Sequence, residues 1–142
     1  MKSKINFYKL NCLFIILILT LNFQSVLSNS PQNKAKWVSP KSADQIVNPL
    51  KGNDTATKEG KKTFQQLCVI CHGDSGKGDG LASVSLNPRP ANLALPEIQN
   101  QTDGAIYWKI TEGRSPMATY KDALTETQRW QLVNFIRTFK KK

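Results

Sequence analysis

Residues 68–72 read Cys-Val-Ile-Cys-His, so two thiols and an imidazole fall within five positions. This C-x-x-C-H pattern is the attachment site of c-type haem. Two thiols three positions apart at the end of a helix lie on nearly the same side, so both can form thioethers with the vinyl groups of one porphyrin. His72 directly follows the second thiol and is placed to bind iron. The motif therefore predicts one covalent haem on Cys68 and Cys71, with His72 as an axial iron ligand.

Other kinds of site also use closely spaced cysteines. A thioredoxin-like motif requires a βαβ context, which this sequence lacks. A zinc site requires a fourth ligand, but the chain has one His, and its third cysteine, Cys12, lies near the N-terminus. A disulfide between Cys68 and Cys71 is sterically awkward at this spacing. Haem attachment is the interpretation that the residues favour.

Met117 is the candidate for the sixth position of the iron. It lies 45 residues after His72, in the sequence Arg-Ser-Pro-Met-Ala at 114–118. A methionine of the core is more typical of a helix face, whereas this one follows a proline in an irregular segment; core packing is the alternative. His/Met ligation raises the reduction potential, and with both axial positions filled no site is open for oxygen or peroxide.

Three helices are predicted to position these residues, and they cover residues 54–68, 102–112 and 126–139. Asp-Thr and Thr-Asp pairs can cap the first two, Gly113 follows the second, and a Thr-Glu-Thr-Gln capping box precedes the third. The segments between them are a glycine-rich stretch at 73–80 and a proline-rich stretch at 86–97. The sequence therefore predicts an all-α domain with unusually long loops, which a large apolar prosthetic group inside them would explain.

Residues 29–53 precede this domain, which spans 54–142, and are predicted to form an extended arm. The segment contains three prolines and few apolar residues. The residues that can pin it to a core are Trp37, Val38, Ile46, Val47 and Leu50.

The N-terminus is predicted to be a secretory signal peptide covering residues 1–28. Lysines precede an apolar run from Leu10 to Leu21, which is short for a membrane span, and cleavage is expected after Ser28. The alternative is an uncleaved anchor, because the cleavage motif departs from A-x-A. We therefore expect the protein in the periplasm or on the outer face of the cytoplasmic membrane.

The motif, the Pro-Met loop and the helices together resemble the class I monohaem cytochromes c of bacteria, over about residues 55–140. The resemblance implies the cytochrome c fold, in which a glycine and an aromatic residue of the first helix cross the last helix. Gly60 and Phe64 would make that crossing with Leu132 and Phe135.

The resemblance also implies that a proline carbonyl accepts the ring N–H of His72, and Pro88 and Pro90 compete for this role. Contacts to the haem propionates are expected from Trp108, Arg89 and Arg114. For Trp108 the alternative is ordinary core packing, and for the two arginines it is a solvated surface.

Composition and charge favour an electron carrier. Cleavage would remove three lysines and lower the formal net charge from +10 to +7, which suits docking on an acidic redox protein such as an oxidase, reductase or respiratory complex. Nucleic acid is excluded as a partner by the predicted export, and membrane association is expected if the signal stays uncleaved. The alternatives are a fixed electron-entry subunit of a larger respiratory or nitrogen-oxide-reducing complex, and a haem sensor or peroxidase.

Overall fold

Residues 36–140 are described by a computed structural model, and from Trp37 onward these residues belong to one compact unit. These residues form helices and loops without a β-strand, so the prediction of an all-α fold is confirmed. The elements in chain order are α2 (Lys41–Asp44), α3 (Asp54–Leu67), α4 (Val69–His72), the 3₁₀ helix η2 (Leu81–Ser85), α5 (Pro96–Gln99), α6 (Asp103–Glu112) and α7 (Glu126–Arg137).

The N-terminal predictions fall outside the described residues. They comprise the signal peptide at 1–28, its alternative as an anchor, and the first part of the arm. Within residues 36–140, no helix has the length and apolar character that crossing a membrane requires.

The three long helices agree with the prediction apart from their ends. The side chain of Asn53 caps α3 by accepting a backbone N–H of the first turn at 2.9 Å, so the cap lies one residue before the predicted Asp54-Thr55 pair. Helix α6 begins one residue later than predicted, because Thr102 is its N-cap, and it ends at Glu112 with Gly113 as its C-cap. Helix α7 begins with the predicted capping box at Thr125 and ends at Arg137, earlier than expected.

The shorter elements α2, α4, α5 and η2 are missing from the prediction. Each has four or five residues, too few for a helical hydrophobic period to appear in a sequence. Because α2 lies within residues 29–53, the prediction of a wholly extended arm is wrong there.

The arm is held to the helices by a buried amide network around Asn48. Its side-chain NH₂ donates to Asp103 Oδ2 and to Asn134 Oδ1, each at 2.9 Å, and its Oδ1 accepts the N–H of Leu50 at 2.9 Å. The amide of Asn134 donates in turn to the Leu50 carbonyl. Each such hydrogen bond contributes about 0.5–1.5 kcal/mol, so this polar network is a substantial anchor.

Apolar contacts of the arm differ in part from those expected. Val38 and Val47 are 68% and 82% exposed, whereas Ala43 of α2 is buried. Ala43 meets α6 at Gly104, where a Cβ would lie 2.0 Å from the Ala43 carbonyl oxygen. The small residues let α2 approach α6 closely, and this contact fixes where the arm runs.

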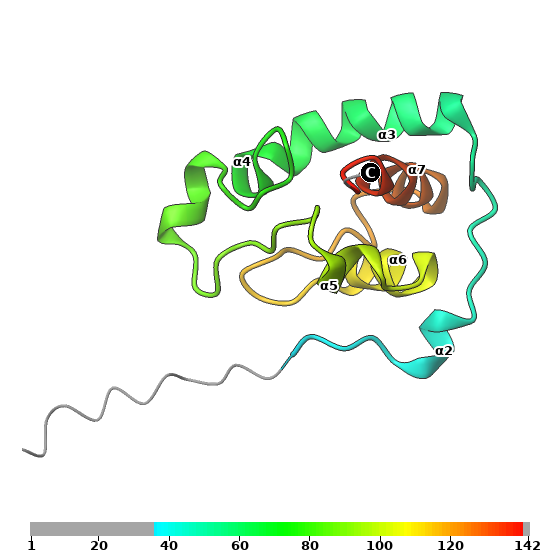
Figure 1. Ribbon diagram of the computed structural model, residues 1–142, viewed down its shortest axis with the longest axis horizontal. Helices are drawn as coiled ribbons and strands as arrows, with labels where there is room; N and C mark the ends of the chain where they lie inside the picture. Colours follow the sequence, from blue (N-terminus) through cyan, green and yellow to red (C-terminus); the bar gives the residue numbers. More distant parts are fainter. Residues whose placement is uncertain (1–35, 141–142) are drawn as a thin grey trace, which may run out of the picture. The chain divides into compact units, whose positions relative to one another are not determined.

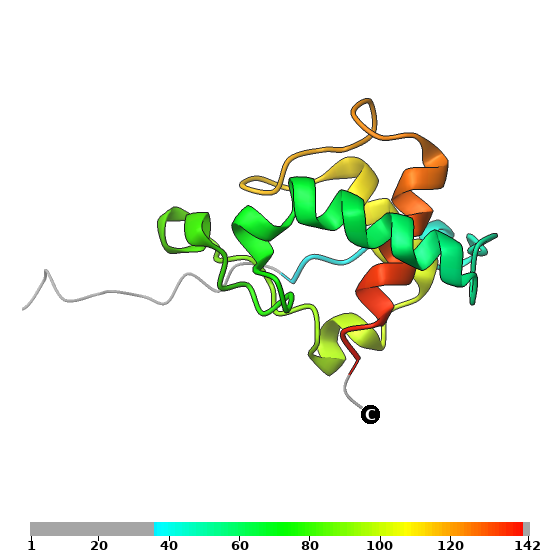
Figure 2. The same cartoon turned by 90° about the horizontal axis from the view of Figure 1, so that it is seen from above.

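Helices α3 and α7 cross in the centre of the domain (Figures 1 and 2). Gly60 sits at the crossing, since a Cβ there would lie 1.9 Å from the carbonyl oxygen of Gln131. Beside it Phe64 and Leu132 are each 1% exposed, and the rings of Phe64 and Phe135 lie 5.2 Å apart. The predicted pairing of the first helix with the last is therefore confirmed.

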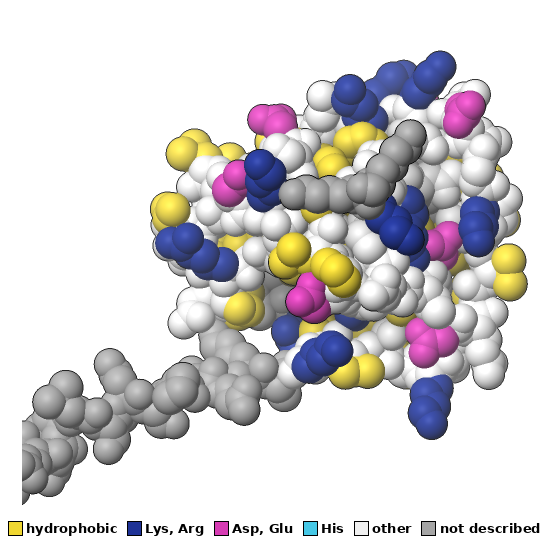
Figure 3. All heavy atoms as spheres, in the orientation of Figure 1, with side chains coloured by type: hydrophobic (Ala, Val, Ile, Leu, Met, Phe, Trp, Pro, Cys, Tyr) yellow, Lys and Arg dark blue, Asp and Glu magenta, His cyan; other side chains and the backbone are white. Residues whose placement is uncertain are grey.

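Charged side chains are mixed on the face shown in Figure 3, where Lys and Arg alternate with Asp and Glu and do not gather in one basic patch. Two exposed apolar side chains lie near the haem motif: Leu81 and Val84 of η2 are 84% and 70% exposed. Helix η2 packs beside α4.

We predict that Gly60→Leu destabilises the domain by about 1–3 kcal/mol or more, because the added side chain meets the backbone of α7, which cannot rotate away. The urea midpoint of unfolding measures the effect. Lys61→Leu, at the next and exposed position of α3, is the control and should change stability little. Equal midpoints for the two variants would contradict the crossing.

Candidate functional site

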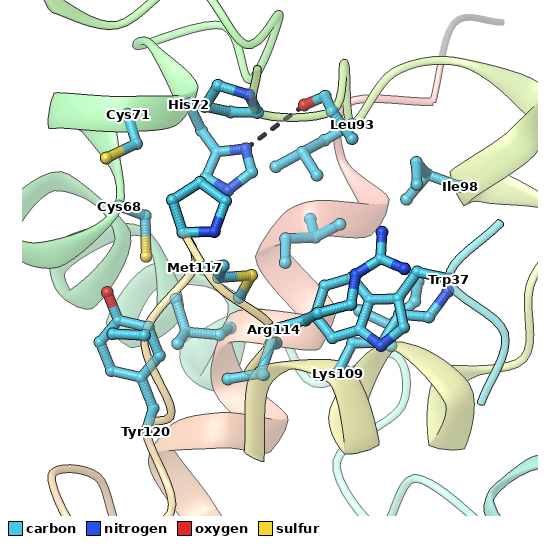
Figure 4. A pocket seen from close by; sticks show the side chains of 18 of the residues that line it. Trp37, Cys68, Cys71, His72, Leu93, Ile98, Lys109, Arg114, Met117 and Tyr120 are labelled. Carbon is cyan, nitrogen blue, oxygen red and sulfur yellow. Dashed lines mark hydrogen bonds between the residues drawn. The ribbon is translucent and has the colours of Figure 1, made fainter. Parts of the chain in front are cut away.

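Cys68, Cys71 and His72 lie where α3 passes into α4, and their side chains line one cavity (Figure 4). The N–H of Cys68 donates to the carbonyl of Phe64 at 2.9 Å, which closes α3. The carbonyl of Cys68 then accepts the N–H groups of Cys71 at 3.1 Å and of His72 at 2.8 Å. This single turn places the two free thiols and the imidazole on the same side of the chain.

The environment of Cys68 favours the protonated thiol. Burial raises its pKa to about 12, and the nearby Cys71 adds to the rise. Thiols that exchange disulfides have lowered pKa values because the thiolate is the nucleophile. The site therefore lacks the electrostatics of a thioredoxin-like centre.

The imidazole of His72 is positioned by a backbone carbonyl that lies next to its Nδ1 atom. Its Nδ1 lies 3.3 Å from the carbonyl oxygen of Ala91, and burial lowers its pKa, which favours the neutral ring. With the proton on Nδ1, that atom donates to Ala91 and leaves Nε2 with a lone pair for a metal. The acceptor is thus neither Pro88 nor Pro90, and the expectation of a proline carbonyl is wrong.

The glycine-rich loop explains why Pro90 is not the acceptor. The N–H of Gly78 donates to the carbonyl of His72 at 2.8 Å, and this glycine has φ +77°. A Cβ on Gly78 would lie 2.2 Å from the carbonyl oxygen of Pro90, so that carbonyl faces the loop. The next carbonyl along the chain, that of Ala91, is the one that reaches the imidazole.

Met117 lines the same cavity and comes from the loop between α6 and α7 (Figure 4). Arg114 and Met117 exchange two backbone hydrogen bonds, of 3.0 and 2.9 Å. Thr119 Oγ1 donates to the carbonyl of Thr111 at 2.6 Å, and the N–H of Tyr120 donates to the carbonyl of Ile110 at 3.2 Å. The loop is thereby folded back on the end of α6, with the half-buried Met117 packed against the core.

Arg129 fixes the second half of this loop, a role that was not predicted from the sequence. The residue is 6% exposed, and its Nη1 donates to the carbonyls of Lys121 and Leu124, each at 2.7 Å. Its Nη2 donates to the hydroxyl of Tyr107 at 3.0 Å. Its position three residues before Leu132, on the inner face of the last helix, is the sequence signal that could have revealed it.

The cavity itself has a volume of about 430 Å³, within the roughly 300–1,000 Å³ range of small-molecule and cofactor sites. Besides the residues above, its mainly apolar wall comprises Phe64, Leu67, Ile70, Leu86, Leu93, Ile98, Ile106, Ile110, Pro116, Ala118, Leu132 and Ile136. An imidazole, a thioether and two thiols face an apolar space that loops enclose. These donors and this wall fit a haem.

Cations supply most of the charge at the cavity. Arg89, Lys109 and Arg114 contribute to its lining, and none of the described lining residues is a carboxylate. Lys109 Nζ donates to Gln101 Oε1 at 2.5 Å. Such an arrangement suits the two acidic propionates of a haem.

The structure does not bring Trp108 to the lining of the cavity, so the cavity does not support its propionate contact, which stays a prediction. On α6 the positions three and four after Ile106 share its face, and these are Lys109 and Ile110, both of which line the cavity. Trp108, at position two, points elsewhere and packs edge-on against Trp37, with ring centroids 6.5 Å apart. The tryptophan that lines the cavity is Trp37, from the arm.

Comparisons with known proteins agree with this site. Residues 55–136, more than half of the chain, match the family described as cytochrome C oxidase, cbb3-type, subunit III. Among solved structures, the KustC0563 c-type cytochrome is 32% identical with a TM-score of 0.51, and the match covers 58% of this chain and 98% of that one. No curated protein matches the chain.

A second solved structure supports the fold. It is a chain of the Kuenenia stuttgartiensis reducing HAO-like protein complex Kustc0457/Kustc0458, 21% identical with a TM-score of 0.60. The match covers 68% of this chain and 50% of that one, so this protein spans half the length of that relative. By its family match and its structural neighbours, the chain belongs to the cbb3-type subunit III family of cytochrome c domains and is a c-type cytochrome with covalently bound haem c.

Proposed function

We propose that this protein is an exported electron carrier that passes single electrons between respiratory redox proteins, with His72 and Met117 as axial ligands of its haem iron. Haem-based electron transfer is the function of its family. The observation that carries the proposal is that one apolar cavity receives His72 from α4 and Met117 from a loop 45 residues later.

Each of these residues has a separate task in the proposal. The haem iron supplies the chemistry, because it can take up and release one electron. Cys68 and Cys71 would form the two thioethers, and Ala91 orients the imidazole of His72. The thioether of Met117 would be a soft ligand to the iron, and as such it would raise the reduction potential and leave no open position for oxygen or peroxide.

Arg89, Arg114 and Lys109 would hold the propionates. The lysine is added to the two predicted arginines because it lies on the cavity face of α6. Among the described residues that line the cavity, the lack of a carboxylate leaves few groups for acid–base catalysis beside the iron. This supports a carrier more than an enzyme.

The proposed partners are acidic redox proteins outside the cytoplasm. Support comes from the net charge of +7 that remains after the predicted cleavage, which raises association rates through the field of the whole protein. A specific observation favours a second candidate, a fixed haem subunit of a larger complex. Leu81 and Val84 are exposed beside α4, and permanent interfaces are more apolar than transient ones.

We predict that wild-type protein retains its haem in acidified organic solvent, whereas the Cys68→Ala/Cys71→Ala double variant releases it, because a porphyrin without thioethers is held by non-covalent contacts alone. Absorbance of the extract measures the release. Cys12→Ala is the matched cysteine control and should retain the haem. Extraction from the wild type would contradict covalent attachment.

We predict that the oxidised protein has a weak long-wavelength sulfur-to-iron absorption and that Met117→Ala abolishes it. Ser115→Ala, an exposed change in the same loop, should leave it intact. Ultraviolet–visible and magnetic circular dichroism spectra are the measurements. A high-spin wild-type spectrum would instead support a haem sensor or peroxidase.

We predict that the rate of electron transfer to an acidic oxidase falls steeply with added salt, because the Debye length shortens from about 10 Å at 0.1 M to about 3 Å at 1 M. Lys77→Glu and Lys121→Glu should lower the rate at low salt, since both lysines are exposed. Lys77 lies in the loop that is hydrogen-bonded to His72, and Lys121 follows the cavity-lining Tyr120. Lys58→Glu is the control, because this exposed lysine lies six residues, or about 9 Å along α3, before Phe64, the first residue of that helix to line the cavity. A flat salt response, with the protein co-purifying in a stable assembly, would instead favour the fixed subunit.

A further inference from the structure

Trp37 brings the segment before the haem domain into the haem site. Its ring is half-buried and lines the cavity. Two cations approach its face: the guanidinium carbon of Arg114 lies 5.0 Å from the ring centroid and Lys109 Nζ lies 5.5 Å from it (Figure 4). Distances below about 6 Å are those of attractive cation–π contacts, for which Trp is the most favourable ring.

Arg114 connects this tryptophan to the loop of Met117. The backbones of Arg114 and Met117 are joined by the pair of hydrogen bonds described above, so a displacement of one displaces the other. Between them Ser115 and Pro116 are exposed, as is Ala118 beyond Met117. A loop with so little buried surface opens at low free-energy cost, and contacts of its side chains with the fold therefore affect how often it opens.

The position of Trp37 is itself fixed. Downstream, α2 is held on α6 by the close contact of Ala43 with Gly104 and by the hydrogen bond from Thr102 Oγ1 to Asp44 Oδ1, at 3.0 Å. The edge of the Trp108 ring supports the indole from α6. Trp37 is thus a fixed surface against which Arg114 can rest.

We infer that Trp37 is a positioning residue for the axial ligand: its indole face holds the Arg114 guanidinium and, through the paired backbones of Arg114 and Met117, keeps the Met117 thioether in the cavity. This inference rests on the proposed role of Met117 as an axial ligand. It gives the arm a task in the haem site, since the segment at 29–53 carries the residue that restrains the loop.

The test compares Trp37→Leu, which removes the aromatic face, with Trp37→Phe, which keeps one. The first measurement is amide hydrogen exchange at the N–H groups of Arg114 and Met117 in the reduced protein. The second is the affinity of the oxidised protein for imidazole, which competes with Met117 for the iron. Val38→Ala, at the neighbouring exposed position, is the control.

We expect Trp37→Leu to speed both amide exchanges by about 3- to 10-fold and to tighten imidazole binding by a similar factor, because a more populated open loop lowers the apparent Kd. Trp37→Phe should restore most of the wild-type behaviour, and Val38→Ala should match the wild type. Arg114→Gln should have at least the effect of Trp37→Leu, because it also removes a proposed propionate contact. In the Arg114→Gln background, Trp37→Leu should add little.

Wild-type exchange in Trp37→Leu, or equal effects of Leu and Phe, would overturn the inference and leave Trp37 as packing. Additive effects of Trp37→Leu and Arg114→Gln would also overturn it, because they would mean that the two residues act separately. If the wild type already lacks the sulfur-to-iron absorption, Met117 ligation has failed, and the inference falls with it. The wild-type spectrum therefore distinguishes failure of the proposed function from failure of the role of Trp37.

Discussion

The close approach of α3 and α7 is the constraint on which the remaining structure depends. At Gly60 the backbones are near enough that a methyl group would meet a carbonyl oxygen of α7. This contact sets the direction in which α3 runs, and therefore where its last turn delivers Cys68 and the short helix α4. It also places Phe64 and Leu132 at the back of the cavity, where they serve both the core and the cofactor wall. Packing and haem binding thus share the same side chains.

Long loops require another kind of support, because they offer few apolar side chains to bury. Here hydrogen bonds to backbone carbonyls supply it. The N–H of Gly78 donates to the carbonyl of His72 and so holds the glycine-rich loop beside it. The guanidinium of Arg129 donates to two carbonyls of the loop that carries Met117. Within residues 36–140 no carboxylate pairs with the buried Arg129. Such an arginine is costly to desolvate unless its donors are satisfied, and several carbonyls and a tyrosine hydroxyl satisfy them. The glycine-rich loop beside His72 and the loop that carries Met117 are therefore held by polar contacts, while the wall of the cavity stays mainly apolar.

The electrostatics of the cavity follow from its apolar wall and from the cations that line part of it. Burial of Cys68 and His72 favours their neutral forms, the protonated thiol and the neutral imidazole. The charges lie on Arg89, Lys109 and Arg114, where acidic groups of a haem can be neutralised. An apolar surround with cations for the propionates supports the proposed electron carrier. The exposed apolar residues of η2 instead favour the second candidate, a permanent subunit.

The sequence alone was sufficient for the haem motif, the three long helices and the pairing of Gly60 and Phe64 with the last helix. These features are local, or follow from a spacing that one helix face repeats. Met117 could be predicted as a candidate iron ligand because a core methionine is more typical of a helix face, whereas this one follows a proline in an irregular segment. The tertiary structure alone decided which carbonyl meets His72, since Pro90 and Ala91 differ by one position and the path of the glycine loop selects between them. It also decided that Trp37 lines the cavity and that Trp108 does not. Trp37 and the residues of α6 that it meets are more than sixty positions apart, and no local pattern of the sequence encodes such a contact.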